Sequence, residues 1–333
     1  MNANKVLISI LNWNKAAETL ACLKSLEPEL ENLVAEVSVL IIDNGSNNQD
    51  LAKLEAGIHL KSYSLKKLPK NLGFTGGHNF SIQISIDEGF DFIWLLNNDS
   101  IVQPGALSAL LSTMQAEPKC GAASPVIHNA DDEYLIATCV RTHSWQSRSY
   151  TQVIAVEEAA RIQSEHPESV WLVGTAIFFR VQALKQVGLL DDRFFAYYDD
   201  NDIGVRLSSG GWHNRCVFSA SVAHEVKRTT GQYPLYFYYL MQRNEMLFWV
   251  KHMPSKYRRL LWLKLVDKAL FDVNRLFRDG LQTRGEITLL AVSDFIFQRF
   301  GAPELNRTVP IFIRILCKIS KIINKKKLIP INA

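Results

Sequence analysis

Apolar runs that end in polar residues recur along the first 230 residues of the chain. The first run, KVLISILNWN at 5–14, is rich in β-branched residues, and apolar residues at helical spacing follow it at 16–26. Residues 36–48, EVSVLIIDNGSNN, repeat the scheme and end in turn-forming residues. Two apolar strands separated by a helix are typical of a parallel βαβ unit, so the N-terminal half predicts a Rossmann-like open sheet.

The next segments extend this predicted sheet. Residues 64–89 are expected to be a glycine-bearing loop that runs into a helix, and the strand that begins at residue 90 ends in Asn97, Asn98 and Asp99. Ligands of open α/β sheets bind outside the carboxyl ends of the strands. The polar endings NWN, DNGS and NNDS are therefore expected to line one crevice.

The pattern is weaker between residues 108 and 170. A helix near 105–116 precedes a polar, poorly periodic stretch at 128–168, for which we expect loops and edge strands. Four further elements follow: a strand at 170–180, a short helix at 181–191, a helix at 200–212 that Gly210 and Gly211 end, and a strand at 214–225 that carries His224.

The character of the chain changes after about residue 230, where long aromatic and basic segments predict helices. Residues 311–333 place isoleucines and a leucine among lysines and an arginine. A basic amphipathic helix of this kind favours the membrane interface, through apolar burial and attraction to anionic headgroups. A helix that packs on its own domain and exposes a solvated lysine face is the alternative.

Composition excludes several classes of protein. The 333 residues are 47% hydrophobic and 21% charged, which is typical of a globular protein, and a net charge of +4 does not indicate a nucleic-acid partner. The five cysteines form no CxxC pair, so neither a disulfide framework nor a zinc site is indicated. No uncharged apolar stretch reaches the roughly 18 residues that cross a bilayer, and no signal peptide is evident. We therefore expect a cytoplasmic protein.

Several polar groups are candidates for chemistry. Asp43 in DNGS offers a carboxylate to a sugar or base edge, although DNGS is also a good turn sequence. NLGFTGGHN at 71–79 offers backbone N–H groups to a phosphate without matching a P-loop. Asp99 is suited to bind Mg²⁺ or Mn²⁺ that bridges a diphosphate, or to cap the next segment. His224 is suited to complete that coordination, or to act as a structural residue.

The stretch YYDDND at 197–202 crowds three carboxylates, Asp199, Asp200 and Asp202, into four positions. Like charges at this spacing repel each other unless a helix terminus, a cation or a proton offsets the cost. Capping of a helix N-terminus explains one or two of the three. A general base among the three would account for a carboxylate that capping leaves unexplained.

Taken in order, eight segments resemble the motif series of family 2 glycosyltransferases: ISILNWNK, VLIIDNGSNN, NLGFTGGHN, WLLNNDSIVQPGAL, VGTAIFFR, GLLDDRFFAYYDDNDIGVRLSSGGW, VAH and YYLMQRN. The resemblance covers about residues 5–245 and is strongest to the rhamnosyltransferase and galactofuranosyltransferase-like branch, which builds bacterial surface polysaccharides such as O antigen or capsule. It implies a GT-A fold over 1–228, with a nucleotide-sugar half at about 1–105 and an acceptor half at about 106–228. The segment 229–333 would be a helical C-terminal extension.

The resemblance also implies roles for individual residues. Asp200 falls at the position of the catalytic base, and Asp199, Asp202 and Gly174 at positions that bind the acceptor or orient the site. Asp99, the last position of a D-x-D motif whose first position is Asn97 here, and His224 would hold the metal. The implied nucleotide-sugar-binding residues are Asn12, Asp43, Asn71, Gly77, Asn79, Asn97 and Asn98, with Gly77 and Asn79 in a nucleotide-binding loop.

The implied activity is inverting transfer of a sugar from a nucleotide sugar, such as a dTDP- or UDP-sugar, with Mn²⁺ or Mg²⁺. The implied acceptor is a lipid-linked saccharide, at the inner face of the membrane. Two alternatives stay open. A sugar nucleotidyltransferase needs a basic glycine-rich signature near the N-terminus, which SILNWNK lacks, and a non-catalytic nucleotide-sugar or membrane-binding module would account for Asn97 in the D-x-D motif.

Overall fold

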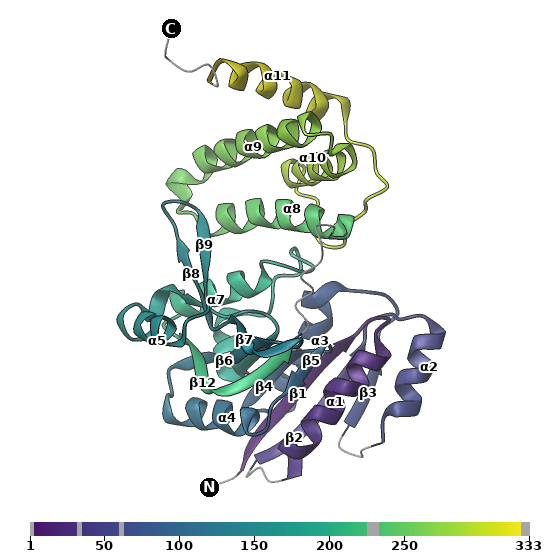
Figure 1. Ribbon diagram of the computed structural model, residues 1–333, viewed down its shortest axis with the longest axis vertical. Coiled ribbons are helices and arrows are strands. Elements are labelled where there is room, and N and C mark those ends of the chain that lie inside the picture. The colour runs from purple at the N-terminus through teal and green to yellow at the C-terminus, as the bar shows by residue number, and fades with distance from the viewer. Residues whose placement is uncertain (1–2, 32–34, 60–62, 225–232, 328–333) are drawn as a thin grey trace. The chain divides into compact units, whose positions relative to one another are not determined.

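The chain divides into two compact units. The computed structural model describes residues 3–31, 35–59, 63–224 and 233–327 (Figure 1). One unit, here called the sheet unit, consists of Met1–Asp192 and Asp199–Arg228. The other, the helical unit, consists of Arg193–Tyr198 and Thr229–Ala333. The boundary that we expect at 228–229 lies outside the described residues.

The sheet unit is built on a mixed, mostly parallel sheet. Its strands follow the order β3 (Tyr63–Lys67), β2 (Ala35–Asp43), β1 (Asn4–Asn12), β4 (Phe92–Asn97), β11 (Ala176–Arg180), β6 (Cys120–Asn129), β12 (His213–His224) and β5 (Ser100–Val102), with β7 (Asp132–Thr138) paired to β6. The first four strands are mutually parallel, as are β6 and β12. Strand β11 is antiparallel to both of its neighbours.

The register brings the polar strand endings to one edge of the sheet. Asn12 lies opposite Asp43, and Leu11 lies opposite Asn97. The expectation that NWN, DNGS and NNDS meet at one edge is therefore confirmed.

Two helical layers cover the sheet, because successive side chains of a strand point to opposite faces. In β4, Trp94 contributes to the core on one face and Ile93 to the core on the other. Helices α1 (Ala16–Glu31), α2 (Asn48–Gly57) and α4 (Ala106–Ala116) pack on the first face. Helices α3 (Gly73–Asp87), α6 (Val181–Val187) and α7 (Asp199–Ser209) pack on the second.

The stretch 128–168 contains more regular structure than the sequence suggests. Strands β8 (Val140–Ser144) and β9 (Ser149–Val153) form a small sheet with β10 (Val170–Trp171), and α5 (Val156–Glu165) and the short 3₁₀ helix Pro167–Ser169 follow β9. The single strand expected at 170–180 is divided into β10 and β11, because the chain turns at Gly174 and Thr175. Strand β3 occupies part of the expected glycine-bearing loop.

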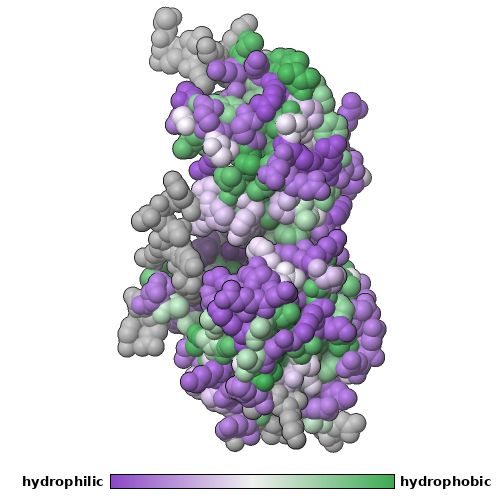
Figure 2. Space-filling view, turned by 90° about the vertical axis from the view of Figure 1, so that its right-hand side faces the viewer, coloured by the Kyte–Doolittle hydropathy of each residue, from purple (hydrophilic) through white to green (hydrophobic). Residues whose placement is uncertain are grey.

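The helical unit consists of α8 (Leu235–His252), α9 (Ser255–Arg278), α10 (Gln282–Ile296) and α11 (Ile311–Lys327). Helix α10 packs on α8 and α9, and α11 packs on α9. Hydrophobic surface, green in Figure 2, is exposed on these C-terminal helices. None of the described helices is both long enough and apolar enough to cross a lipid bilayer.

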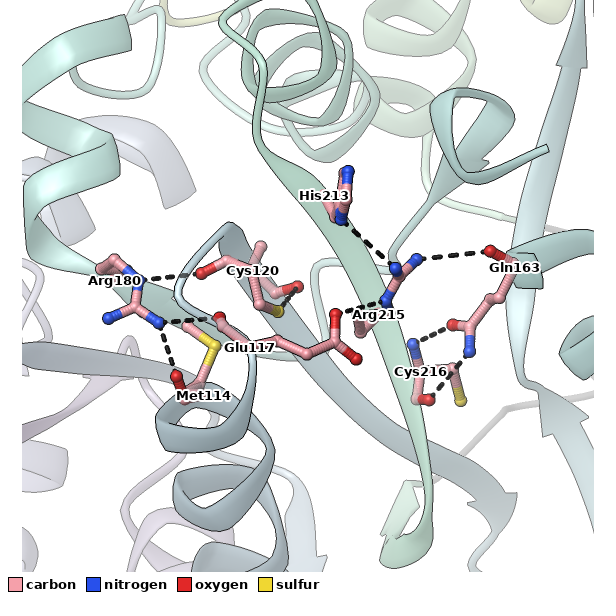
Figure 3. Close-up of polar contacts among 9 residues, drawn as sticks. Met114, Glu117, Cys120, Gln163, Arg180, His213, Arg215 and Cys216 are labelled. Carbon is pink, nitrogen blue, oxygen red and sulfur yellow. Dashed lines mark hydrogen bonds and ion pairs between the residues drawn. The ribbon is translucent and has the colours of Figure 1, made fainter. Parts of the chain in front are cut away.

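Two arginines bind the segment that joins α4 to β6 (Figure 3). Arg180 of β11 donates to the carbonyl oxygens of Met114, Glu117 and Cys120, which follow one another at the end of α4 and the start of β6. Arg215 of β12 pairs with the Glu117 carboxylate at 2.9 Å. These contacts satisfy carbonyl groups that the end of a helix leaves without intrahelical partners.

Candidate active site

The carboxyl ends of β1 and β2 are tied together by one amide. Asn12 Nδ2 donates to Asp43 Oδ1 at 3.0 Å and to Asp50 Oδ2 at 3.0 Å. Asp43 also accepts from the backbone N–H of Ser46, and its side chain is buried. Asn12 and Asp43 therefore shape this edge of the crevice, and both of the predicted roles of DNGS, as a turn and as a site segment, are compatible with the geometry.

The DNGS turn packs directly on the loop before α3. Asn44 accepts from the Leu72 N–H at 2.9 Å and donates to Asn71 Oδ1 at 3.1 Å. Gly45 has φ +76°, and a Cβ atom there would lie 2.6 Å from Lys70 Cα. Only glycine fits both the conformation and the space. Asn44 is a site residue that the sequence analysis missed, although it lies within the quoted motif.

Gly77 and Asn79 lie within α3 and not in a loop, which corrects the expectation for NLGFTGGHN. A Cβ atom at Gly77 would lie 2.4 Å from Leu11 Cδ1, so glycine allows the helix to approach β1. Asn79 donates to the Leu190 carbonyl and to Asp192, and it accepts from the Leu190 N–H. Both residues thus hold elements of the crevice together.

The predicted metal ligands meet where the turn after β4 approaches the end of β12. Asp99 lies in the turn between β4 and β5, and His224 ends β12, which pairs with β5. Asp99 Oδ1 is 3.0 Å from His224 Nε2, and Asn97 Nδ2 is 3.4 Å from the same nitrogen. Asn98 donates to Thr19 at 3.0 Å and faces away from this pair of residues.

The donor set of Asp99 and His224 fits a divalent cation. Asp99 Oδ1 is buried, and apart from His224 no donor among the described residues reaches it. A carboxylate oxygen and an imidazole nitrogen 3.0 Å apart would both be within reach of one Mn²⁺ or Mg²⁺ ion. No third His, Cys, Asp or Glu of the described chain joins them, so substrate phosphate and water would complete the shell.

The pKa of Asp99 reflects the same surroundings. Burial alone would raise it, but the hydrogen bond and charge of His224 and the charge of Lys15 lower the pKa below its usual value.

A short turn joins this side of the site to the acidic cluster. Thr175 O accepts from the Asn97 N–H at 2.8 Å. Its neighbour Gly174 donates its N–H to Asp200 Oδ2 at 3.1 Å. The predicted metal-side residues and the predicted base are thus connected through two adjacent residues of one turn.

The acidic cluster occupies the first turn of α7, where the positive end of the helix dipole favours carboxylates. Asp202 is fully buried and pairs with Arg206 at 2.9 Å, while Arg206 also donates to three backbone carbonyls. Asp199 is buried as well. Asp202 therefore forms a buried ion pair within α7, and the acceptor-binding or site-orienting role implied for it stays a prediction.

Arg141 of β8 compensates the charge of Asp200. Its Nη1 lies 3.1 Å from Asp200 Oδ2, and both side chains retain some exposure, 20% for Arg141 and 12% for Asp200. The guanidinium also lies over the ring of Tyr150, 5.2 Å from its centre. Arg141 comes from the stretch 128–168, and no signal in the sequence pointed to it.

The segment that leads into α7 is strained. Phe195, Tyr197 and Tyr198 all have φ between +66° and +68°, a region that residues other than glycine rarely adopt. Such strain persists only where the surroundings enforce it, and it concentrates at functional sites.

Two residues of α8 enforce this conformation. The Asn244 amide donates to the carbonyl oxygens of Phe194, Ala196 and Tyr197 at 2.8–3.0 Å. Arg243 donates to the Phe194 carbonyl at 3.3 Å and to Asn244 Oδ1 at 3.1 Å. Both side chains are fully buried. The motif YYLMQRN thus fixes the backbone directly before the acidic cluster.

A family model described as Glycosyltransferase like family 2 matches residues 5–243, which contain every site residue named above except Asn244. The chain belongs to this family. The resemblance inferred from the motifs is confirmed.

Named relatives agree with the expected branch. An N-acetylglucosaminyl-diphospho-decaprenol L-rhamnosyltransferase of Mycobacterium tuberculosis is 30% identical over 235 residues, which is 62% of this chain and 75% of the relative. Galactofuranosyltransferase GlfT1 of Mycolicibacterium smegmatis is 25% identical over 226 residues, 67% of this chain and 72% of the relative.

Solved structures share the fold. A mannosyltransferase from Pyrobaculum calidifontis, in complex with GDP-Man and Mn²⁺, aligns with a TM-score of 0.55 and 11% identity over 89% of this chain and 88% of its own. S. aureus TarS 1–349 with UDP-GlcNAc aligns with a TM-score of 0.56 and 12% identity, over 96% of this chain and 89% of its own. The GT-A fold with C-terminal helices is therefore confirmed.

Proposed function

We propose that this chain is an inverting, divalent-metal-dependent glycosyltransferase with Asp200 as its general base. It takes a sugar from a nucleoside diphosphate sugar, a dTDP- or UDP-sugar in our proposal, and transfers it to a saccharide carried on a lipid diphosphate. The rhamnosyltransferase relative, which is named for an N-acetylglucosaminyl-diphospho-decaprenol acceptor, supports the acceptor class.

Inversion at the anomeric carbon requires one base on the face opposite the leaving group, and no covalent intermediate. Asp200 removes the proton from the attacking hydroxyl of the acceptor, and the Gly174 N–H and Arg141 hold its carboxylate in place. Arg141 also keeps positive charge beside the carboxylate. The hydroxyl oxygen forms the new glycosidic bond while the bond to the nucleoside diphosphate breaks.

Asp99 and His224 are the residues that would hold Mn²⁺ or Mg²⁺. When bound there, the cation supplies positive charge to the departing diphosphate. Asp43, Asn44 and the start of α3 form the nucleotide side of the proposed site, since the positive end of a helix favours phosphate.

The observation that carries the proposal is the Gly174–Thr175 turn. It bonds to Asp200 on one side and to Asn97 on the other, so a base and a metal-side amide are held in one crevice of the family's fold. A structural ion pair between Asp200 and Arg141 alone would not require this second connection.

The test compares Asp200→Asn with wild type on a panel of UDP-, dTDP- and GDP-sugars, with Mn²⁺ or Mg²⁺ and membrane-extracted acceptor. We expect metal-dependent release of nucleoside diphosphate by wild type, a loss of about 100-fold or more in Asp200→Asn, and a product of inverted anomeric configuration. Asp87→Asn, an exposed carboxylate at the end of α3, is the matched control and should keep full activity.

Normal turnover by Asp200→Asn would refute the base assignment. If wild type binds a nucleotide sugar and never turns it over, the chain is a binding module and the proposal is wrong.

We also propose that α11 holds the protein on the cytoplasmic face of the membrane. One face of α11 packs on α9, with Ile313 and Cys317 buried and Asn274 of α9 donating to the Cys317 carbonyl at 2.8 Å. The opposite face exposes six apolar side chains: Ile311, Phe312, Ile315, Leu316, Ile319 and Ile322. Basic residues of the same helix lie beside this face, which favours anionic lipid over a neutral partner.

The double variant Ile315→Ser/Ile319→Ser tests this placement. The two side chains are 49% and 45% exposed, so their transfer to the membrane would contribute about 2 kcal/mol together, or roughly 30-fold in vesicle binding. Ile154→Ser, 52% exposed in the sheet unit, is the control. Equal sedimentation of all three proteins with phosphatidylglycerol vesicles would refute the proposal.

A further inference from the structure

The helical unit contains a cavity of its own that the proposed chemistry does not use. Its volume is about 390 Å³, within the range of small-molecule sites. Residues from the strained segment, from the chain just before α8, and from α8, α9 and α10 surround it: Tyr198, Tyr233, Phe237, Tyr238, Met241, Gln242, Glu245, Asp272, Arg275, Leu276, Arg284 and Thr288.

One wall of the cavity is aromatic. Tyr233 and Phe237 stack with ring centres 4.3 Å apart, and Tyr238 meets Phe237 edge-on at 5.7 Å. Tyr233 is 47% exposed, so ring surface is open to a ligand. Polarised C–H groups of a sugar pack favourably against the electron-rich faces of such rings.

The cavity also carries charged groups: Arg275 and Arg284, together with Glu245 and Asp272, whose carboxylates both pair with Lys268. The Arg284 guanidinium lies 4.2 Å from the centre of the Tyr238 ring, and no carboxylate in the described part of the chain pairs with it. Its N–H groups are thus available to an anion, and a guanidinium binds phosphate through two parallel hydrogen bonds. Arg275 lies on the same cavity and pairs with Asp272 at 3.4 Å.

An aromatic wall with an arginine stacked on one of its rings suits a ligand that is a sugar at one end and an anion at the other. We propose that this cavity binds the glycosyl diphosphate head of the acceptor, with the sugar on Tyr233 and Phe237 and the diphosphate at Arg284. The proposal rests on the proposed function, which supplies an acceptor of this class. Gln242 and Thr288 add polar groups suited to sugar hydroxyls.

The position of the cavity along the chain supports this assignment. Tyr198 lines the cavity and directly precedes Asp199 and Asp200. The backbone that Asn244 holds in its strained conformation therefore runs from the cavity wall into the helix turn that carries the proposed base. The binding of an acceptor at Tyr198 would therefore depend on the conformation of this segment.

The first experiment measures binding by calorimetry, with the full chain and without donor or metal. The probe is farnesyl-diphospho-N-acetylglucosamine, and inorganic diphosphate and phosphatidylglycerol vesicles are the comparison ligands. We expect the probe to bind wild type and to lose at least tenfold in affinity in both Arg284→Ala and Phe237→Ala. Arg259→Ala and Tyr257→Ala, which remove an exposed arginine and an exposed tyrosine of α9 outside the cavity, are the matched controls and should bind normally.

Three results would overturn the assignment. In the first, inorganic diphosphate binds as tightly as the probe and Phe237→Ala does not change the affinity of the probe, so the cavity is a simple anion site. Vesicles could bind through Arg284 without competition from the probe, which would mark a lipid-headgroup site. The probe could also bind all variants equally. Melting temperatures of the variants, with Arg284→Lys as the conservative substitution, separate lost binding from lost folding.

Kinetics then separate this proposal from the proposed function. With an active donor, Arg284→Ala should raise the KM for acceptor at least tenfold and leave hydrolysis of the donor in water unchanged. An unchanged acceptor KM refutes the cavity assignment and leaves the transferase intact. If wild type transfers no sugar while probe binding still depends on Arg284 and Phe237, the proposed function fails and the cavity assignment stands.

Discussion

Replacing Asn244 by alanine should reduce turnover far more than stability. The amide holds three backbone carbonyls at 2.8–3.0 Å, and its two N–H groups are both used. If the segment kept its shape without them, unsatisfied buried carbonyls would cost about 2–4 kcal/mol. The three left-handed residues of this segment store at least about 3 kcal/mol.

These two quantities are similar, so the segment is expected to relax when Asn244 is lost. Relaxation releases the strain and limits the net loss of unfolding free energy to about 1 kcal/mol. It also moves the backbone directly before Asp199 and Asp200. Because a displacement of about 1 Å in a catalytic group costs roughly 100-fold, we expect kcat to fall by that factor.

The assay measures kcat, the donor dissociation constant and urea unfolding for Asn244→Ala and for Asn274→Ala. Asn274 also donates to two backbone carbonyls, those of Leu270 and Cys317, but holds no strained segment. The control should lose about 1–2 kcal/mol of stability and keep its kcat. A wild-type kcat in Asn244→Ala, or equal losses of kcat in both variants, would refute the reasoning.

Burial lowers the pKa of His78 to about 3, against about 6.5 in the unfolded chain. As the pH falls, the unfolded state therefore binds a proton before the folded state does. The free energy of unfolding should fall from pH 6.5 toward pH 3, by about 2 kcal/mol at pH 5. Urea unfolding at pH 7.5 and 5.0 should show this loss in wild type and not in His78→Asn; identical pH dependence in the two would contradict it. Asp99→Asn and His224→Gln should each weaken Mn²⁺ binding by roughly 10–100-fold, measured by electron paramagnetic resonance, and undiminished affinity in either would remove that ligand. Gly45→Ala should weaken donor binding and should cost more stability than Gly89→Ala. Both glycines have positive φ, but only a Cβ atom at residue 45 would meet backbone atoms. Equal losses of stability would show that backbone strain, and not this steric contact, determines the effect.

Three of the strands that the sequence predicted, β1, β2 and β4, contribute to the buried cores on both faces of the sheet. Strands β1, β2 and β4 read as continuous apolar runs because helices cover both sides of the sheet. Strand β6 was missed although it lies inside the sheet, since its sequence CGAASPVIHN contains small residues and Pro125 in its middle. Proline in an interior strand is unusual, and here it lies next to the irregular register between β6 and β12.

The site divides in a similar way. Asp200, Asp99 and His224 could be named from motifs because each lies at the start or the end of a recognisable element. Arg141 could not, since it lies 59 residues from Asp200 in a stretch without periodicity. The motif containing Asn244 was recognised, but its role depends on left-handed tyrosines that no local sequence signal predicts.

Three carboxylates within four positions are tolerated because a helix N-terminus and two arginines compensate their charge. The N-terminus of α7 acts on all of them, Arg206 neutralises Asp202 inside the protein, and Arg141 neutralises Asp200 at its edge. The difference in exposure separates Asp200 from Asp202 as candidate bases, since a buried carboxylate cannot meet an acceptor hydroxyl. Asp202 has a fully buried side chain, whereas that of Asp200 is 12% exposed. Asp200 is therefore the better placed of the two to accept a proton from substrate, and the arginine beside it holds the carboxylate without enclosing it.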